Sequence, residues 1–169
     1  MKKLVLIAFA LVMGIQGMQA QEVFLEVMKM SREVAEDKTK DMATRKIATF
    51  KYDQLTYMYN KVLPIVLKDT TNTEVITKNM QMLDEQAYAM YMFCHMFVEK
   101  LAKAKKDKER SDIMSTFKNA SLNNPYFNDD DKEFVNAYVD HPDFLTHFSL
   151  DTDFVKALAE IKQKYNIKE

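Results

Sequence analysis

The most restrictive feature of this sequence is a stripe of apolar residues in the middle of the chain. Eight side chains, separated alternately by four and three positions, make up the stripe: Ile76, Met80, Leu83, Ala87, Met90, Cys94, Phe97 and Leu101. A mean spacing of about 3.5 residues places them all on one side of an α-helix. We therefore predict one long helix over about 73–105, with the stripe buried.

The opposite side of this predicted helix is polar near both ends but not in the middle. There it carries four large side chains without a full charge: Tyr88, Met92, His95 and Met96. A helix without a polar face is normally buried on all sides, so we expect the other helices to pack around this one. If these four residues instead face solvent, they are the candidate interaction surface of the protein.

Glycine is nearly absent. The two glycines are Gly14 and Gly17, and none follows. Phosphate-binding loops, dinucleotide-binding turns and nucleophile elbows need glycine where the backbone approaches a ligand or turns sharply. Tight β-hairpins also favour glycine, at positive φ. Helices joined by loops rich in Asn and Asp do not need it, and the composition therefore predicts an all-α fold.

Shorter apolar patterns predict two helices before the central one. The first spans about 22–36 and buries a face made of Val23, Val27, Met30 and Val34. The second spans about 41–63, and Pro64 either ends it or kinks it.

Three more helices are predicted after the central one. One spans about 109–122, and one begins at a capping box formed by Asp130 and Glu133. The last is capped by the run SLDTD at 149–153 and buries Phe154, Leu158, Ile161 and Tyr165. The whole prediction is a single-domain bundle of five to six helices around the 73–105 helix, with no sheet.

The first 20 residues have the pattern of a secretory signal peptide. Lys2 and Lys3 precede an apolar stretch, and the small residue Ala20 offers a cleavage site. The apolar stretch is shorter than the roughly 20 residues that a membrane-spanning helix needs. We therefore predict that residues 1–20 are removed and that residues 21–169 form one helical domain. The protein is expected to be exported to the periplasm or beyond, without membrane insertion.

Charge limits the partners of the exported chain. Without Lys2 and Lys3, 22 basic residues face 25 acidic ones, a net charge of about −3, which predicts no nucleic-acid partner. The end of the central helix is nevertheless rich in basic residues: Lys100, Lys103, Lys105, Lys106, Lys108 and Arg110. Basic side chains stabilise the C-terminal end of a helix dipole. This cluster is therefore either a solvated helix end or an anion-binding site.

Met92, His95 and Met96 could also bind a metal. Their spacing of three and four residues puts them on one helical face. Thioether and imidazole ligands suit Cu(I), although methionine is equally a common filler of protein cores. Cys94, the single cysteine, lies on the buried stripe and is predicted to be an inert thiol.

No pattern predicts catalysis. The sequence shows no nucleophile paired with a base and no glycine-built phosphate site. An enzyme would have to use a set such as His141 or His147 with Asp151 or Asp153, which also lacks the spacing of a zinc site. The acidic run at 128–131 lacks the glycine and glutamate of an EF-hand calcium loop.

Four short segments together resemble a known family. They are ATFK at 48–51, LDEQAY at 83–88, NNPYFND at 123–129 and FSLDTD at 148–153. The combination resembles a family of small exported all-helical proteins of unknown function from Bacteroidetes-type bacteria. In that family a Trp follows the last segment, where this chain has Phe154. The resemblance implies a place in the bacterial envelope and no catalytic residue.

These observations favour a non-catalytic protein over an enzyme. We expect an interaction or accessory module of the cell envelope that acts through a protein partner or through self-association. The alternative is a small-ligand binder that holds Cu(I) with Met92, His95 and Met96. No other cofactor is predicted.

Overall fold

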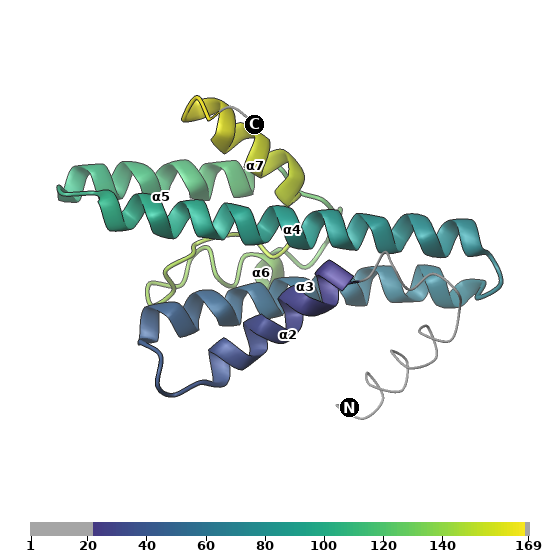
Figure 1. Cartoon of the computed structure of the whole chain (residues 1–169). Coiled ribbons are helices and arrows are strands. Elements are labelled where there is room, and N and C mark those ends of the chain that lie inside the picture. Colours follow the sequence, from purple (N-terminus) through teal and green to yellow (C-terminus); the bar gives the residue numbers. More distant parts are fainter. Residues whose placement is uncertain (1–21, 168–169) are drawn as a thin grey trace.

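The computed structural model describes residues 22–167, and six helices make up most of this part of the chain (Figure 1). In the labels of Figure 1 they are α2 (Glu22–Glu36), α3 (Met42–Lys68), α4 (Thr73–Lys103), α5 (Asp107–Leu122), α6 (Lys132–Val135) and α7 (Phe154–Lys164). The described residues contain no strand, and an isolated bridge joins Pro125 to Thr152. The all-α prediction is confirmed. The predicted signal peptide, residues 1–20, lies outside the described residues.

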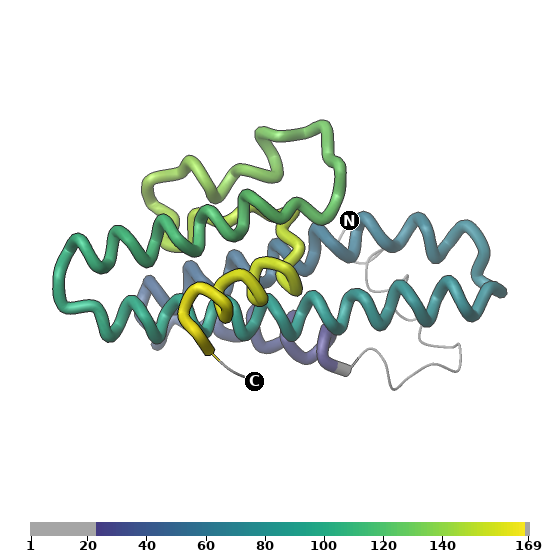
Figure 2. The backbone as a smooth tube through the Cα atoms, turned by 90° about the horizontal axis from the view of Figure 1, so that it is seen from above, coloured from purple at the N-terminus to yellow at the C-terminus, as the bar shows by residue number. Residues whose placement is uncertain are grey.

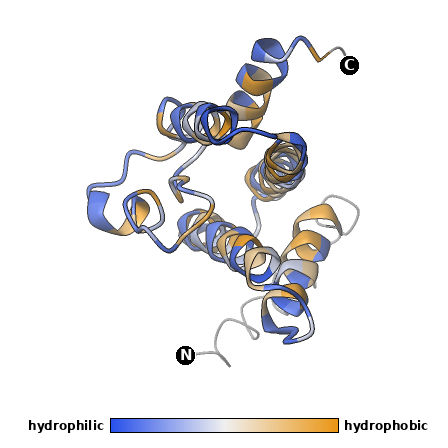
Figure 3. Ribbon diagram, turned by 90° about the vertical axis from the view of Figure 1, so that its left-hand side faces the viewer, coloured by the Kyte–Doolittle hydropathy of each residue, from blue (hydrophilic) through white to orange (hydrophobic). Residues whose placement is uncertain are grey.

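The central helix is the predicted one. α4 begins after Asn72, whose side chain accepts a hydrogen bond of 3.1 Å from the Val75 N–H, and it ends at Lys103. It packs against α2, α3, α5 and α7, and Figure 2 shows it running alongside α3 and α5. The predicted stripe is buried from Ile76 to Phe97 and half-buried at Leu101. In Figure 3, which looks along the long helices, apolar positions lie mainly on the sides that face other helices.

α3 is longer than predicted. It continues through Pro64 to Lys68, so of the two alternatives left open for Pro64, an end of the helix at Leu63 is ruled out. A proline inside a helix removes one hydrogen bond and costs about 3 kcal/mol. Val62 and Val66 are buried on either side of Pro64, and burial of each stabilises the helix by about 1.5–3 kcal/mol. Packing therefore offsets the break.

The buried face of α2 differs from the predicted one. Val23 and Met30 are 37% and 41% exposed, whereas Phe24, Val27 and Ser31 are buried. Two contacts from other helices set this rotation. The Phe24 ring stacks on Tyr59 at 6.2 Å, and the Phe24 N–H donates to Oδ1 of Asp84 at 2.8 Å.

The segment between α5 and α7 runs along the side of the bundle and contains the short helix α6 (light green in Figure 2). The N-cap of α6 is Asp131, which accepts a hydrogen bond of 2.9 Å from the Phe134 N–H. The predicted capping box at Asp130 is therefore wrong by one residue. Asp129 accepts from the Asp131 N–H at 3.0 Å, which fixes the turn that makes Asp131 the cap.

α7 has Asp153, the last residue of the predicted capping run 149–153, as its N-cap, and it lies over α4 and α5. Its start is fastened to α4 by Gln86. The Gln86 Nε2 donates to Oδ1 of Asp153 at 2.9 Å, and the Phe154 N–H donates to Oε1 of Gln86 at 2.8 Å. The Asp153 N–H donates to the Asn124 carbonyl at 2.7 Å. Segments 83–88, 123–129 and 148–153 therefore meet at one point.

Six phenylalanines form the centre of the core and are almost fully buried: Phe50, Phe93, Phe97, Phe117, Phe148 and Phe154. Phe148 comes from the segment before α7, and its ring contacts those of Phe50, Phe93 and Phe97 at 5.6, 5.1 and 5.2 Å in edge-to-face geometry. Such aromatic pairs add about 0.5–1.5 kcal/mol beyond area burial. The 123–153 segment is thus part of the core, although most of it is not helical.

Candidate functional site

Only part of the interaction surface that was predicted on α4 is exposed to solvent. Tyr88 is 58% exposed and His95 also faces solvent, but Met92 is half-buried and Met96 is only 7% exposed. Tyr91 is also exposed, and its ring stacks on that of His95 with the ring centres 6.4 Å apart. Cu(I) binding by Met92, His95 and Met96 stays a prediction. Among the described residues, no group of three or more His, Cys, Asp or Glu side chains is placed to hold a metal ion.

Cys94 is buried. Burial raises the pKa of its thiol to about 12. A thiol that stays protonated is a poor nucleophile, so this side chain acts as a small core residue.

The histidines and aspartates considered for catalysis make separate contacts. His141 is exposed beside Phe144, and Nδ1 of His147 lies 3.0 Å from the Val139 carbonyl. Asp151 is buried and accepts a hydrogen bond from the Phe127 N–H, while Asp153 caps α7. The two carboxylates therefore hold backbone groups in place.

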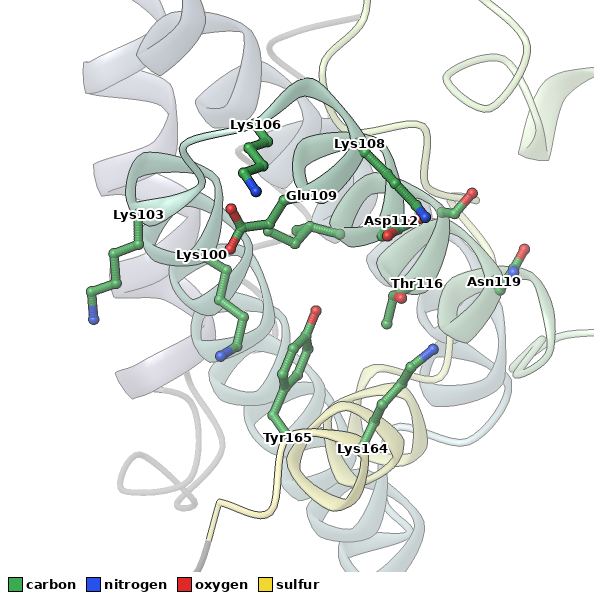
Figure 4. A pocket seen from close by; sticks show the side chains of 12 residues that line it. Lys100, Lys103, Lys106, Lys108, Glu109, Asp112, Thr116, Asn119, Lys164 and Tyr165 are labelled. Atoms are coloured by element: carbon green, nitrogen blue, oxygen red, sulfur yellow. The ribbon is translucent and has the colours of Figure 1, made fainter.

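A cavity of about 880 Å³ opens where the end of α4 meets α5 and α7 (Figure 4). We call it the lysine cleft, after the five lysines that line it: Lys100, Lys103, Lys106, Lys108 and Lys164. Two carboxylates, those of Glu109 and Asp112, also line it, so positive charge predominates. For the six basic residues at the end of the central helix, the sequence left two interpretations open, a solvated helix end and an anion-binding site. In the structure, four of these six residues line the cavity.

The lysines of the cleft differ in their contacts. The Lys100 ammonium lies 3.8 Å from the centre of the Tyr165 ring, a cation–π contact that holds it in place. Lys103 pairs with Glu99 on its own helix and points away from the cavity in Figure 4. No ion pair within the described residues occupies Lys106, Lys108 or Lys164.

The wall of the cleft also carries hydroxyl groups. Tyr165, the residue after α7, and Thr116 of α5 both line the cavity in Figure 4. Burial raises the pKa of Tyr165, and a hydrogen bond with Thr116 partly opposes this rise. Sequence reasoning missed Lys164, Tyr165 and Thr116 because only the fold brings α7 to the end of α4.

The acidic residues of the cleft are partly engaged. Oε2 of Glu109 accepts a hydrogen bond of 3.0 Å from the Lys105 N–H, which closes the turn between α4 and α5. Arg110, predicted as part of the basic cluster, donates from Nη1 to the Leu101 carbonyl at 2.9 Å and supports the same turn. The cleft can therefore offer several ammonium groups and two hydroxyls to an anionic ligand.

Comparison of the chain with models of protein families, with curated proteins and with solved structures found no match. The resemblance to the family of exported proteins therefore stays a prediction. Within residues 22–167, no helix combines the length and the apolar character needed to cross a membrane.

Proposed function

We propose that this protein is a non-catalytic interaction module of the bacterial envelope that binds an acidic segment of a partner protein in the lysine cleft. The observation that carries the proposal is a cavity lined by lysines from α4, α5, α7 and the α4–α5 turn, of which Lys106, Lys108 and Lys164 form no ion pair within the described residues. Like charges brought together in a concave site attract anions more strongly than the same charges spread over a surface.

The exposure of these lysines supports binding rather than catalysis. Lys103, Lys106, Lys108 and Lys164 are exposed to solvent. A nucleophilic lysine is typically desolvated in an apolar pocket, whereas an exposed ammonium is suited to attracting and orienting an anionic partner.

An acidic protein segment fits the cleft better than a nucleic acid does. Without Lys2 and Lys3 the chain has a net charge of about −3, whereas five lysines and two carboxylates line the lysine cleft. A long phosphate backbone would extend over the acidic remainder of the surface and be repelled. Ile113 and the Tyr165 ring also line the cleft, and they offer apolar contacts to side chains between the carboxylates.

The test is a titration with a fluorescent peptide in which glutamate alternates with an apolar residue, at low and at physiological ionic strength. The control peptide carries Gln in place of Glu. The double variant Lys106→Glu, Lys164→Glu should weaken binding by about tenfold or more, since each exposed charge pair contributes up to about 1 kcal/mol. Lys38→Glu, Lys40→Glu is the matched control, with the same change of net charge at exposed positions in the α2–α3 turn.

The proposal predicts that the control variant binds as the parent does and that the Gln peptide does not bind. An equal loss of peptide affinity in both double variants would show that binding depends only on the net charge of the protein, and it would overturn the proposal. Tighter binding of a single-stranded oligonucleotide than of the acidic peptide would also overturn the proposal.

A further inference from the structure

A second cavity, of about 680 Å³, lies between α3 and the segment that carries α6. Two tyrosine–aspartate pairs cross it in opposite directions. Tyr57 of α3 donates from its hydroxyl to Oδ2 of Asp129 at 2.8 Å. Tyr138 donates from its hydroxyl to Oδ2 of Asp53, on α3, at 2.6 Å. We call this cavity the tyrosine–aspartate cleft.

One of the two pairs already holds an ammonium group. The Lys61 Nζ lies 2.6 Å from Oδ2 of Asp129 and 5.4 Å from the centre of the Tyr57 ring. Carboxylate and aromatic ring thus bind the same cation, which is how proteins recognise ammonium groups in aromatic cages.

The other pair has no such cation from the protein. Asp53 is half-buried, and within residues 22–167 no lysine, arginine or histidine forms an ion pair with it. Burial raises the pKa of Asp53, and the hydrogen bond from Tyr138 only partly opposes this rise. A carboxylate removed from water without a counter-charge is unfavourable, and a cationic ligand would relieve this cost.

An open aromatic ring lies in the same cavity. Phe134 of α6 lines the cleft and is 52% exposed, although it is among the largest apolar side chains of the chain. Its ring centre is 6.1 Å from that of Tyr57. The ring of Tyr138 is covered by Phe144 at 4.4 Å, so the ring surface available to a ligand is that of Phe134.

We propose that the tyrosine–aspartate cleft binds a small organic cation with a primary ammonium or guanidinium group, which pairs with Asp53 and contacts the Phe134 ring. Asp131 also lines the cleft, so a second amine on the same ligand has a second carboxylate within the cavity. The volume lies within the range of small-molecule sites, about 300–1,000 Å³. This site is independent of the lysine cleft and of the function proposed for it.

The test is isothermal titration of the folded protein, residues 21–169, with putrescine and with agmatine. The uncharged analogue 1,4-butanediol has the same carbon chain as putrescine and serves as the ligand control. Asp53→Asn removes the charge while its amide oxygen can still accept the Tyr138 hydrogen bond. Glu74→Gln removes one charge at an exposed position at the start of α4 and is the matched control.

We expect both amines to bind and butanediol not to bind. Asp53→Asn should weaken amine binding by about tenfold or more, and Glu74→Gln should leave it unchanged. Phe134→Leu keeps an apolar side chain but removes the ring, and it should weaken binding by about two- to fivefold.

The proposal would be overturned if the parent bound neither amine or bound butanediol as tightly. Amine binding that survives in Asp53→Asn would also overturn it. Thermal unfolding of each variant shows whether it is folded. If Asp53→Asn does not fold, the test is Phe134→Leu, because the exposed ring of Phe134 contributes little to the core. Unchanged amine binding in Phe134→Leu would then reject the site.

Discussion

The hydroxyl of Tyr57 donates a hydrogen bond to Asp129, 72 residues further along the chain, and both side chains are almost fully buried. With the Lys61 ammonium on the same carboxylate oxygen, this contact fastens the α5–α7 segment to α3. Hydrogen bonds from Lys61 and then from Tyr57 lower the pKa of Asp129 from 3.8 to about 2.

Asp129 should therefore support folding above the pKa of an unfolded aspartate. A carboxyl whose pKa is lower in the folded state stabilises the fold above about pH 4 and loses this contribution as pH falls towards 2. Asp129→Asn should be less stable than the parent at pH 7, and its stability should fall less between pH 4 and 2. Urea unfolding midpoints across this pH range measure the difference.

Asp53 offers the opposite case as a control. Burial raises the pKa of Asp53 in the folded state. The stabilisation that the protonated carboxyl gives to the fold is therefore complete at low pH, and it is lost as the pH rises above about 4 and through the raised pKa. Asp53→Asn should change the pH dependence above pH 4, not below it. Identical pH profiles for the two variants would contradict both assignments.

Two buried glutamines should respond oppositely to the same substitution. Neither side-chain polar atom of Gln54 has a partner among the described residues, whereas Gln86 uses its amide to bind Asp153 and Phe154. An unpaired buried polar group costs about 1–3 kcal/mol. Gln54→Met should thus raise the free energy of unfolding by about 1 kcal/mol, and Gln86→Met should lower it by about 1–3 kcal/mol. Chemical denaturation gives both values, and a loss in Gln54→Met would show that the amide is hydrated or otherwise bound.

A charge inside the stripe of α4 should prevent folding. Leu83 is buried against the bundle, and an aspartate there would be an unpaired buried charge, which costs several kcal/mol. Leu83→Asp should lose the cooperative thermal transition seen by circular dichroism. Tyr88→Asp, on the exposed side of the same helix, is the matched control and should unfold as the parent does.

Methionine oxidation should follow the burial of each side chain. Met42 is 60% exposed and should react first with peroxide, Met92 should react more slowly, and the buried Met90 and Met96 should resist. Mass spectrometry of tryptic peptides measures each rate. Addition of Ag(I), which takes the same soft ligands as Cu(I) but is not oxidised by peroxide, should leave the order unchanged. Selective protection of Met92, with Met42 still reactive, would support the copper site instead.

The sequence predicted those features that depend on local pattern. The period of the central stripe was enough to predict the start of α4 and to place its end within two residues, and the run 149–153 was recognised as the cap of the last helix. The rotation of α2 was not predictable in this way. Phe24 is buried because Tyr59 and Asp84, which lie on other helices, determine which side of α2 faces inward.

The candidate sites depend even more on distant residues. The lysine cluster at the end of α4 was visible in the sequence, but Lys164 and Tyr165 reach it only because α7 folds back over α4 and α5. The bond between Tyr138 and Asp53 joins residues 85 positions apart. No periodicity or spacing rule connects such positions, since the fold alone determines their distance.

Phe148 also determines when the molecule can finish folding. Its ring fills the centre of a cluster that α3, α4, α5 and α7 share, yet it belongs to the last quarter of the chain. A chain synthesised only as far as α5 would expose the rings of Phe50, Phe93 and Phe97 to water. Contacts between residues so far apart close late and slowly. The aromatic core of this chain can therefore be completed only after its C-terminal part has been made.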